Sequence, residues 1–174
     1  MDLAGLTLVI GGAASGKSRI AEEMIKASGR PKIYVATAQI FDDEMAEKVR
    51  AHRRQRGADW TTHEAPLDLP AALATVQGDQ AILIDCLTLW LTNHILAESD
   101  IDAETKKLFA AIDACPAPIV LVTNETGGGI VPENALARRF RNAQGRLNQA
   151  VAAKAERVVA VMAGLPLTLK DISA

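Results

Sequence analysis

One eight-residue stretch has the residue types and the spacing needed to hold phosphate groups. Residues 11–18 read Gly-Gly-Ala-Ala-Ser-Gly-Lys-Ser, which matches the pattern G-x-x-x-x-G-K-[ST]. Glycines let successive backbone N–H groups curve around phosphate oxygens, and a helix that follows adds positive partial charge at its first turn. We name this stretch the phosphate loop, and its candidate nucleotide contacts are Gly11, Gly12, Ala13, Ala14, Ser15, Gly16, Lys17 and Ser18.

The last two residues of the phosphate loop would have separate chemical tasks. Lys17 is a catalytic candidate, because its ammonium would neutralise the β- and γ-phosphates of a bound nucleotide. Ser18 offers a hydroxyl suited to Mg²⁺. An apolar run precedes the loop and a helix-prone stretch follows it, which is the context that makes the pattern specific. The loop therefore predicts an enzyme that binds a purine nucleoside triphosphate, ATP or GTP, together with Mg²⁺.

Asp85 is the second candidate for holding the metal. It ends the apolar run of residues 81–85, and a carboxylate at the tip of a buried parallel strand is typical of the second magnesium-organising group in such enzymes. The alternative is that Asp85 caps the helix expected over residues 87–96.

His52 lies in a basic stretch of the helix expected over residues 43–56. Acidic residues precede the cations, an order that also suits the helix dipole at about 0.3–1 kcal/mol per charge. The functional alternative is a polyanion such as a triphosphate, with the cations favouring a neutral His52 imidazole whose free nitrogen acts as a nucleophile. His63 and His94 have no such setting. The cations are Lys48, Arg50, Arg53, Arg54 and Arg56.

Short apolar strands alternate with helix-prone stretches along the chain. Near-continuous Val/Ile/Leu runs favour a parallel sheet covered on both faces, so we predict an α/β, doubly wound, mostly parallel sheet of the P-loop NTPase type. Residues 158–163 and 165–169 would form a C-terminal antiparallel hairpin. The expected strands are 6–10, 32–36, 81–85, 119–123 and 158–163. The expected helices are 18–27, 43–56, 69–76, 87–96, 102–114 and 133–156.

Composition excludes several other classes of protein. The 174 residues are 49% hydrophobic with a formal net charge of −2, which fits a single domain over residues 1–174 and gives no polycationic signature for nucleic acid. No apolar stretch reaches the ~20 residues of a membrane span. Cys86 and Cys115 have no zinc-site spacing. We expect a cytoplasmic protein.

Several further segments recur in order and spacing in one known family. They are the phosphate loop and residues 34–39 (YVATAQ), 42–45 (DDEM), 52–54 (HRR), 60–64 (WTTHE), 85–93 (DCLTLWLTN), 122–125 (VTNE), 129–134 (GIVPEN), 138–141 (RRFR) and 145–149 (GRLNQ). Over nearly its whole length the chain resembles the bifunctional adenosylcobinamide kinase / adenosylcobinamide-phosphate guanylyltransferases of cobalamin assembly.

This resemblance implies two reactions and a set of site residues. A nucleoside triphosphate, ATP or GTP, would phosphorylate adenosylcobinamide, and GTP would then transfer GMP to adenosylcobinamide phosphate through a guanylylated histidine at His52. The resemblance also implies a homotrimer. By the same matching, the residues lining the GTP site would be Ala36, Thr37, Ala38, Arg53, Arg54, Gln55, Arg56, Glu64 and Asp85.

Two positions depart from the family pattern, and two rival functions are weighed against it. Ala14 stands where the family usually has arginine, and Gly57 stands where proline is common. The first rival is a small-molecule kinase without guanylyltransferase activity. The second is a regulatory GTP-binding module, which would need an Asn-Lys-x-Asp segment where this chain has Thr-Asn-Glu-Thr at residues 123–126. Residues 123–132, with three consecutive glycines at 127–129, are expected to form a mobile loop that closes over the corrinoid or its phosphate.

Overall fold

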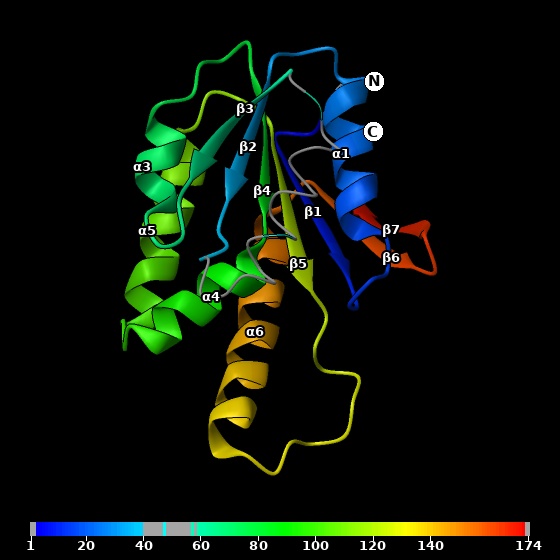
Figure 1. Ribbon diagram of the computed structural model, residues 1–174. Coiled ribbons are helices and arrows are strands. Elements are labelled where there is room, and N and C mark those ends of the chain that lie inside the picture. Colours follow the sequence, from blue (N-terminus) through cyan, green and yellow to red (C-terminus); the bar gives the residue numbers. More distant parts are fainter. Residues whose placement is uncertain (1–2, 40–46, 48–56, 58, 173–174) are drawn as a thin grey trace.

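The computed structural model describes residues 3–39, 47, 57 and 59–172. Its centre is a seven-stranded sheet in the order β3-β2-β4-β5-β1-β6-β7 (Figure 1). The strands are β1 (Leu6–Gly11), β2 (Lys32–Ala36), β3 (Trp60–Glu64), β4 (Ala81–Asp85), β5 (Ile119–Asn124), β6 (Arg157–Met162) and β7 (Leu165–Asp171). The helices are α1 (Lys17–Ala27), α3 (Leu69–Ala74), α4 (Leu87–Leu96), α5 (Ile101–Ala114) and α6 (Ala135–Lys154).

Every strand pair is parallel except the last. β1 lies between β5 and β6, β4 lies between β5 and β2, and β7 pairs antiparallel with β6. The predicted C-terminal hairpin is thus confirmed, as is the mostly parallel α/β sheet. Parallel strands place all their carboxyl ends at one edge of the sheet, so the segments after β1, β2, β3, β4 and β5 meet there.

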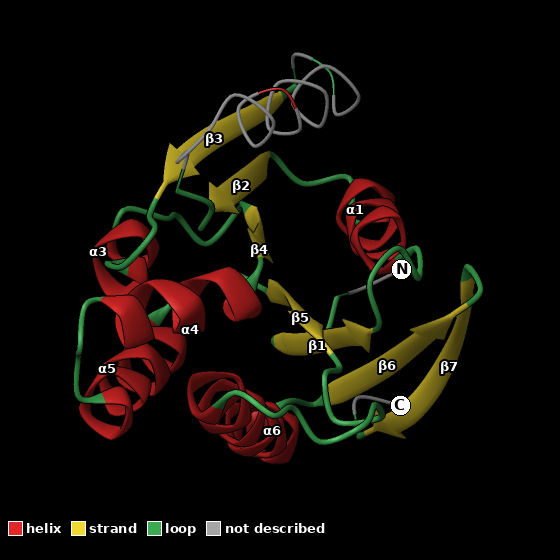
Figure 2. Cartoon of the chain, turned by 60° about the horizontal axis from the view of Figure 1, so that its bottom comes forward, coloured by secondary structure: helices red, strands yellow, loops and turns green. Residues whose placement is uncertain are grey.

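Helices cover both faces of the sheet, which makes the fold doubly wound. Figure 2 shows α1 on one face, and α3, α4, α5 and α6 on the other. Two buried clusters follow this division. One joins Ile20, Ala21 and Ile25 of α1 to one set of strand side chains, and the larger one lies under the other four helices. We call these two sides of the sheet the α1 face and the α6 face.

The expected elements agree closely with the observed ones, with one omission. Strand β3 is missing from the expected set, because its sequence Trp-Thr-Thr-His-Glu is polar and only Trp60 is buried. An edge strand needs few apolar side chains, and the two threonines and the tryptophan were its only β-sheet signal. The helix expected over residues 43–56 lies outside the described residues. Among the described helices, none is long and apolar enough to cross a membrane.

Candidate functional site

The phosphate loop connects β1 to α1 at the carboxyl edge of the sheet. Gly16 occupies the N-cap position of α1 with φ +93°, and Ala14 also has a positive φ of +54°. The left-handed conformation is open to glycine but strained for alanine. The Lys17 ammonium donates a hydrogen bond to the Gly12 carbonyl at 3.1 Å, so the lysine side chain folds back over the loop.

The turn of the C-terminal hairpin contacts the phosphate loop. The Gly164 N–H donates to the Ser15 carbonyl at 2.8 Å, and Arg19 donates to the Gly164 carbonyl at 3.1 Å. A Cβ on Gly16 would lie 3.1 Å from the Gly164 Cα. Two segments almost 150 residues apart in sequence therefore determine the shape of this loop together.

Gly11 is the loop position that tolerates no side chain. A Cβ there would lie 2.4 Å from Ser15 Oγ and 2.6 Å from the Val161 carbonyl oxygen of β6. Overpacking of this kind costs about 1–3 kcal/mol, and each kcal/mol lowers Tm by roughly 2–4 °C in a chain of this size. We expect Gly11→Ala to lower Tm by several degrees in a thermal melt.

Gly12→Ala is the matched control, because a Cβ on Gly12 would meet no atom within 4 Å. Its Tm should stay within about 1 °C of the wild-type value, since surface changes of this kind are nearly neutral. Equal melting temperatures for the two variants would contradict the packing at Gly11.

Three predicted site residues lie in one row across neighbouring strands. Asp85 pairs with Ala36, and Ala36 pairs with Glu64. Side chains alternate along a strand, and Tyr34 and Leu83, two residues before Ala36 and Asp85, belong to the cluster under α1. The row therefore points to the α1 face, where the phosphate loop begins α1. At 4.7–4.9 Å per strand, Asp85 is roughly 10 Å and Glu64 roughly 19 Å across the sheet from β1.

Asp85 shares its surroundings with a tyrosine and a buried thiol. Tyr34 donates from its hydroxyl to Asp85 Oδ2 at 3.4 Å. Burial, and then the Asp85 carboxylate, raise the pKa of the Cys86 thiol to about 11, whereas Lys17 acts in the opposite direction. The N-cap residue of α4 is Cys86, the residue after Asp85.

Asp85 and Ser18 offer a donor set that suits Mg²⁺. A carboxylate and a hydroxyl are hard oxygen ligands, and Mg²⁺ commonly takes only one or two protein ligands beside substrate phosphates and waters. In agreement with such a sparse site, no group of three or more metal-binding side chains occurs within the described residues.

Thr37 is fully buried, and its hydrogen-bonding groups are used inside the protein. Its hydroxyl donates to the Cys86 carbonyl and accepts from the Cys86 N–H, both at 2.7 Å. Its own N–H donates to the Asp85 carbonyl at 3.3 Å. Thr37 therefore fixes the end of β4, where Asp85 lies. The neighbouring Ala36 and Ala38 are half-buried.

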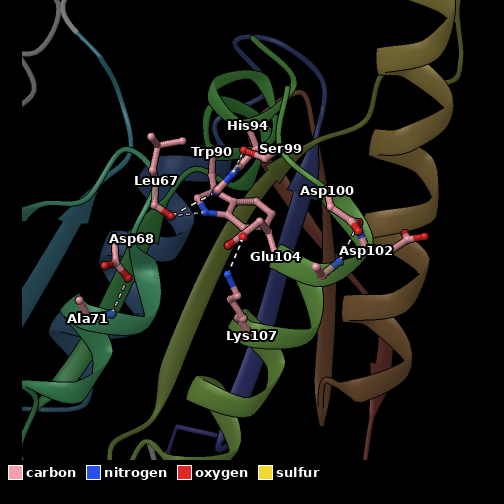
Figure 3. Close-up of polar contacts among 11 residues, drawn as sticks. Leu67, Asp68, Ala71, Trp90, His94, Ser99, Asp100, Asp102, Glu104 and Lys107 are labelled. Carbon is pink, nitrogen blue, oxygen red and sulfur yellow. Dashed lines mark hydrogen bonds and ion pairs between the residues drawn. The ribbon is translucent and has the colours of Figure 1, made fainter. Parts of the chain in front are cut away.

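Helix α4 holds the loops that follow β2 and β3. Asn93 donates to the carbonyls of Thr37 and Pro66, at 2.9 and 2.8 Å. Figure 3 shows Trp90 and His94 both pointing to the Leu67 carbonyl, which lies 2.9 Å from Trp90 Nε1 and 3.2 Å from His94 Nε2. These hydrogen bonds hold the loops at the carboxyl edge of the sheet in place.

The two histidines that the structure describes, His63 and His94, differ in their surroundings. His94 is 4% exposed, and its second ring nitrogen contacts Ser99 Oγ at 3.0 Å, so both nitrogens are engaged. His63 pairs with Val35, which belongs to the cluster on the α6 face, so His63 points away from the face of the phosphate loop. His52 lies outside the described residues, and so do Arg53, Arg54, Gln55 and Arg56.

The segment between β5 and α6, residues 125–134, projects beyond the sheet before it returns to α6 (Figure 1). Two arginines of α6 bind its backbone. Arg138 donates to the Pro132 carbonyl at 2.9 Å, and Arg141 donates to the carbonyls of Gly127 and Ile130. The three glycines thus lie where the arginines of α6 hold the backbone. Closure of this segment over a corrinoid stays a prediction.

The sequence reading missed one polar group at this edge. Asn124 ends β5, directly beside Gly11. In the sequence, Asn124 belongs to the family segment 122–125 and to the loop expected over residues 123–132, without a site role of its own. Its position after an apolar strand was the signal that could have found it.

Comparison with known proteins agrees with this architecture. The family model described as "Cobinamide kinase / cobinamide phosphate guanyltransferase" matches residues 7–169. The chain is 45% identical to the bifunctional adenosylcobalamin biosynthesis protein CobP of Pseudomonas aeruginosa, with 94% of this chain and 96% of that protein covered. It is 44% identical to the bifunctional adenosylcobalamin biosynthesis protein CobU of Salmonella typhimurium, with 95% and 99% covered.

Similar solved structures share the fold at low identity. The flagellar accessory protein FlaH from Methanocaldococcus jannaschii has a TM-score of 0.53 at 12% identity, with 97% of this chain and 80% of that chain covered. A protein from Pyrococcus horikoshii OT3, Project ID PH0250, has a TM-score of 0.58 at 10% identity, with 99% and 89% covered. The structural likeness shows the fold alone, and the sequence matches decide the family. The chain belongs to the cobinamide kinase / cobinamide phosphate guanyltransferase family.

Proposed function

We propose that one domain spanning residues 1–174 catalyses two successive transfers onto adenosylcobinamide. The observation that carries this proposal is that the phosphate loop and Asp85 lie on the same face and edge of the sheet, in a chain of this family. The two groups would act on one triphosphate together with Mg²⁺ held by Ser18 and Asp85. The two rival functions are a small-molecule kinase and a regulatory GTP-binding module. Neither accounts for the guanyltransferase activity named in the family match.

In the first reaction, Lys17 and the loop N–H groups would hold the β- and γ-phosphates of ATP or GTP. The substrate alcohol bonds to the γ-phosphorus while the bond to the β–γ bridging oxygen breaks, and the diphosphate leaves. Glu64, far from Lys17 across the sheet, would contact a different part of a nucleotide, alongside Ala36 and Ala38. Thr37 would act by positioning Asp85.

In the second reaction, His52 would attack the α-phosphorus of GTP and displace pyrophosphate. The phosphate of adenosylcobinamide phosphate then takes the GMP group from the histidine and gives adenosylcobinamide-GDP. The structure supports His52 by disfavouring its competitors, because His94 is buried with both nitrogens engaged and His63 points to the α6 face. Arg53, Arg54, Gln55 and Arg56 would hold the triphosphate beside it. The family resemblance further supports a cytoplasmic homotrimer, and sedimentation of the purified chain measures its assembly.

A covalent labelling experiment tests this proposal. The chain is incubated with Mg²⁺ and GTP carrying radioactive phosphorus at the α-position. We expect label on the protein that is lost in acid and retained in base, since this is the behaviour of a phosphorus–nitrogen bond. GTP labelled at the γ-position should leave no such label. Equal labelling from both nucleotides would contradict a guanylylated histidine.

A further inference from the structure

Asn124 lies between the two elements that carry the phosphate-binding and metal-binding candidates. It ends β5, the strand between β1 and β4. Asn124 pairs with Gly11, and the next N–H, that of Glu125, donates to the Gly11 carbonyl at 3.0 Å. Its side chain is therefore at the start of the phosphate loop, one strand away from the strand of Asp85.

Alternation along β5 assigns the Asn124 side chain to the α1 face. Val122 belongs to the cluster under α1, and the Thr123 hydroxyl donates to Asn148 Oδ1 of α6 at 2.8 Å. Asn124, the next residue, must point back toward the α1 face. Lys17 and Asp85 belong to this same side of the sheet.

The backbone of Asn124 is held on both sides. Its N–H donates to Thr88 Oγ1 at 2.8 Å, and its carbonyl accepts from Asn148 Nδ2 at 3.0 Å. Asn148 is fixed in turn by Gln144, whose Nε2 donates to Asn148 Oδ1 at 2.8 Å. The backbone at Asn124 is therefore positioned before any ligand arrives, and a fixed backbone restricts where the side chain can lie.

The amide of Asn124 has no partner in the part of the chain that the structure describes. Its Oδ1 is buried and accepts no hydrogen bond there. Buried polar atoms are nearly always paired, and an unpaired one lowers stability. An oxygen left in this state beside a phosphate-binding loop is explained by a ligand that supplies the missing hydrogen bond.

We propose that Asn124 is a catalytic residue of the phosphoryl transfer, an inference that rests on the proposed function. Its Oδ1 accepts a hydrogen bond from the substrate alcohol, and its Nδ2 donates to an oxygen of the γ-phosphate. A side-chain amide offers an acceptor and a donor close together without charge. The amide thereby aims the alcohol oxygen at the γ-phosphorus, which is how positioning accelerates a reaction.

Asn124 neither gains nor loses a proton or electrons in this step. The alcohol oxygen forms its bond to the γ-phosphorus as the bond to the β–γ bridging oxygen breaks, and the leaving diphosphate takes that electron pair. The alcohol proton passes to a γ-phosphate oxygen and then to water. Guanylyl transfer occurs at the α-phosphorus, so it has no need of a group that orients an alcohol at the γ-phosphate.

The test compares Asn124→Ala and Asn124→Asp with the wild-type chain. We expect kcat for phosphorylation of adenosylcobinamide to fall about 100-fold in both, the loss typical of one preorganised donor. In Asn124→Ala, KM for the nucleotide and the amount of covalent GMP adduct formed from GTP should stay within about threefold. Asn124→Asp retains the size and the acceptor but replaces the donor by a negative charge beside phosphate.

Thermal stability separates this role from a structural one. Asn124→Ala should leave Tm unchanged or raise it, because the amide has no described partner to lose. Asn148→Ala is the matched control and should lower Tm, since it removes bonds to Thr123, Gln144 and the Asn124 carbonyl.

Each other outcome overturns the inference. Unchanged phosphorylation by Asn124→Ala, a rise in KM with unchanged kcat, or an equal loss of adduct formation would each remove the specific role at the γ-phosphate. In all three cases the wild-type activities would still support the proposed function. A wild-type chain that phosphorylates no adenosylcobinamide would overturn the proposed function and this inference with it.

Discussion

Replacing Lys17 by alanine is expected to lower the rates of both transfers by roughly 100- to 1,000-fold, the range found when one preorganised charge stabiliser is removed. Both reactions begin with a triphosphate whose negative charge this ammonium would neutralise. Folding should be little affected, because within the described residues the Lys17 side chain hydrogen-bonds only to the Gly12 carbonyl. Kinase and guanylyltransferase assays, with circular dichroism as the folding measurement, check this result.

Lys26→Ala is the control for this variant. Lys26 lies on the same helix α1, has a side chain that is 45% exposed, and forms a 3.8 Å ion pair with Glu22. An exposed pair of this kind adds little stability, so both activities and the circular dichroism spectrum should be retained. Near-normal GTP turnover by Lys17→Ala would contradict the assignment of residues 11–18 as the phosphate site.

Replacing His52 by asparagine should abolish guanylyl transfer and the covalent GMP adduct while phosphorylation of adenosylcobinamide continues. Formation of a phosphorus–nitrogen bond requires a nitrogen nucleophile, whereas phosphoryl transfer at a phosphate loop depends on positioning, Lys17 and Mg²⁺. Chromatography that resolves adenosylcobinamide phosphate from adenosylcobinamide-GDP follows the two products separately. The phosphate should accumulate, and no GDP product should appear.

His63→Asn is the matched histidine variant and should retain both products, because His63 points to the α6 face. Loss of GDP product from His63→Asn, with continued product from His52→Asn, would transfer the nucleophilic role to His63. Equal loss of both products from His52→Asn would indicate a structural or shared triphosphate-binding role for that residue.

Local sequence predicted most of the sheet, because its strands are short runs of large apolar residues. The interior strands β1, β2, β4 and β5 agree with the expectation to within one residue, and the antiparallel hairpin at the C-terminus agrees to within two. Strand β3 was not predicted, because an edge strand needs little apolar surface. The order of strands was beyond the reach of local pattern, since it depends on pairing between distant segments.

The phosphate loop was predicted with all its residues because phosphate binding depends on local backbone shape. The roles of other residues depend on which face they point to, and this information requires strand register. Thr37 was expected to line the nucleotide site, yet it is buried beneath Asp85 and bonded to Cys86. Asn124 becomes recognisable as a candidate site residue only once β5 is known to lie between β1 and β4.

The contact between Gly164 and Ser15 joins the phosphate loop to a segment that is synthesised much later. The phosphate loop precedes β5 and β6 in the chain, but its strand β1 is flanked by both, and its backbone is held by the turn at Gly164. Contacts between such distant segments form late and slow the folding of a domain. A nascent chain halted before Arg157 would thus contain the entire loop sequence, and we expect it to bind no nucleotide. The loop would take its binding shape only after the hairpin of β6 and β7 has been made.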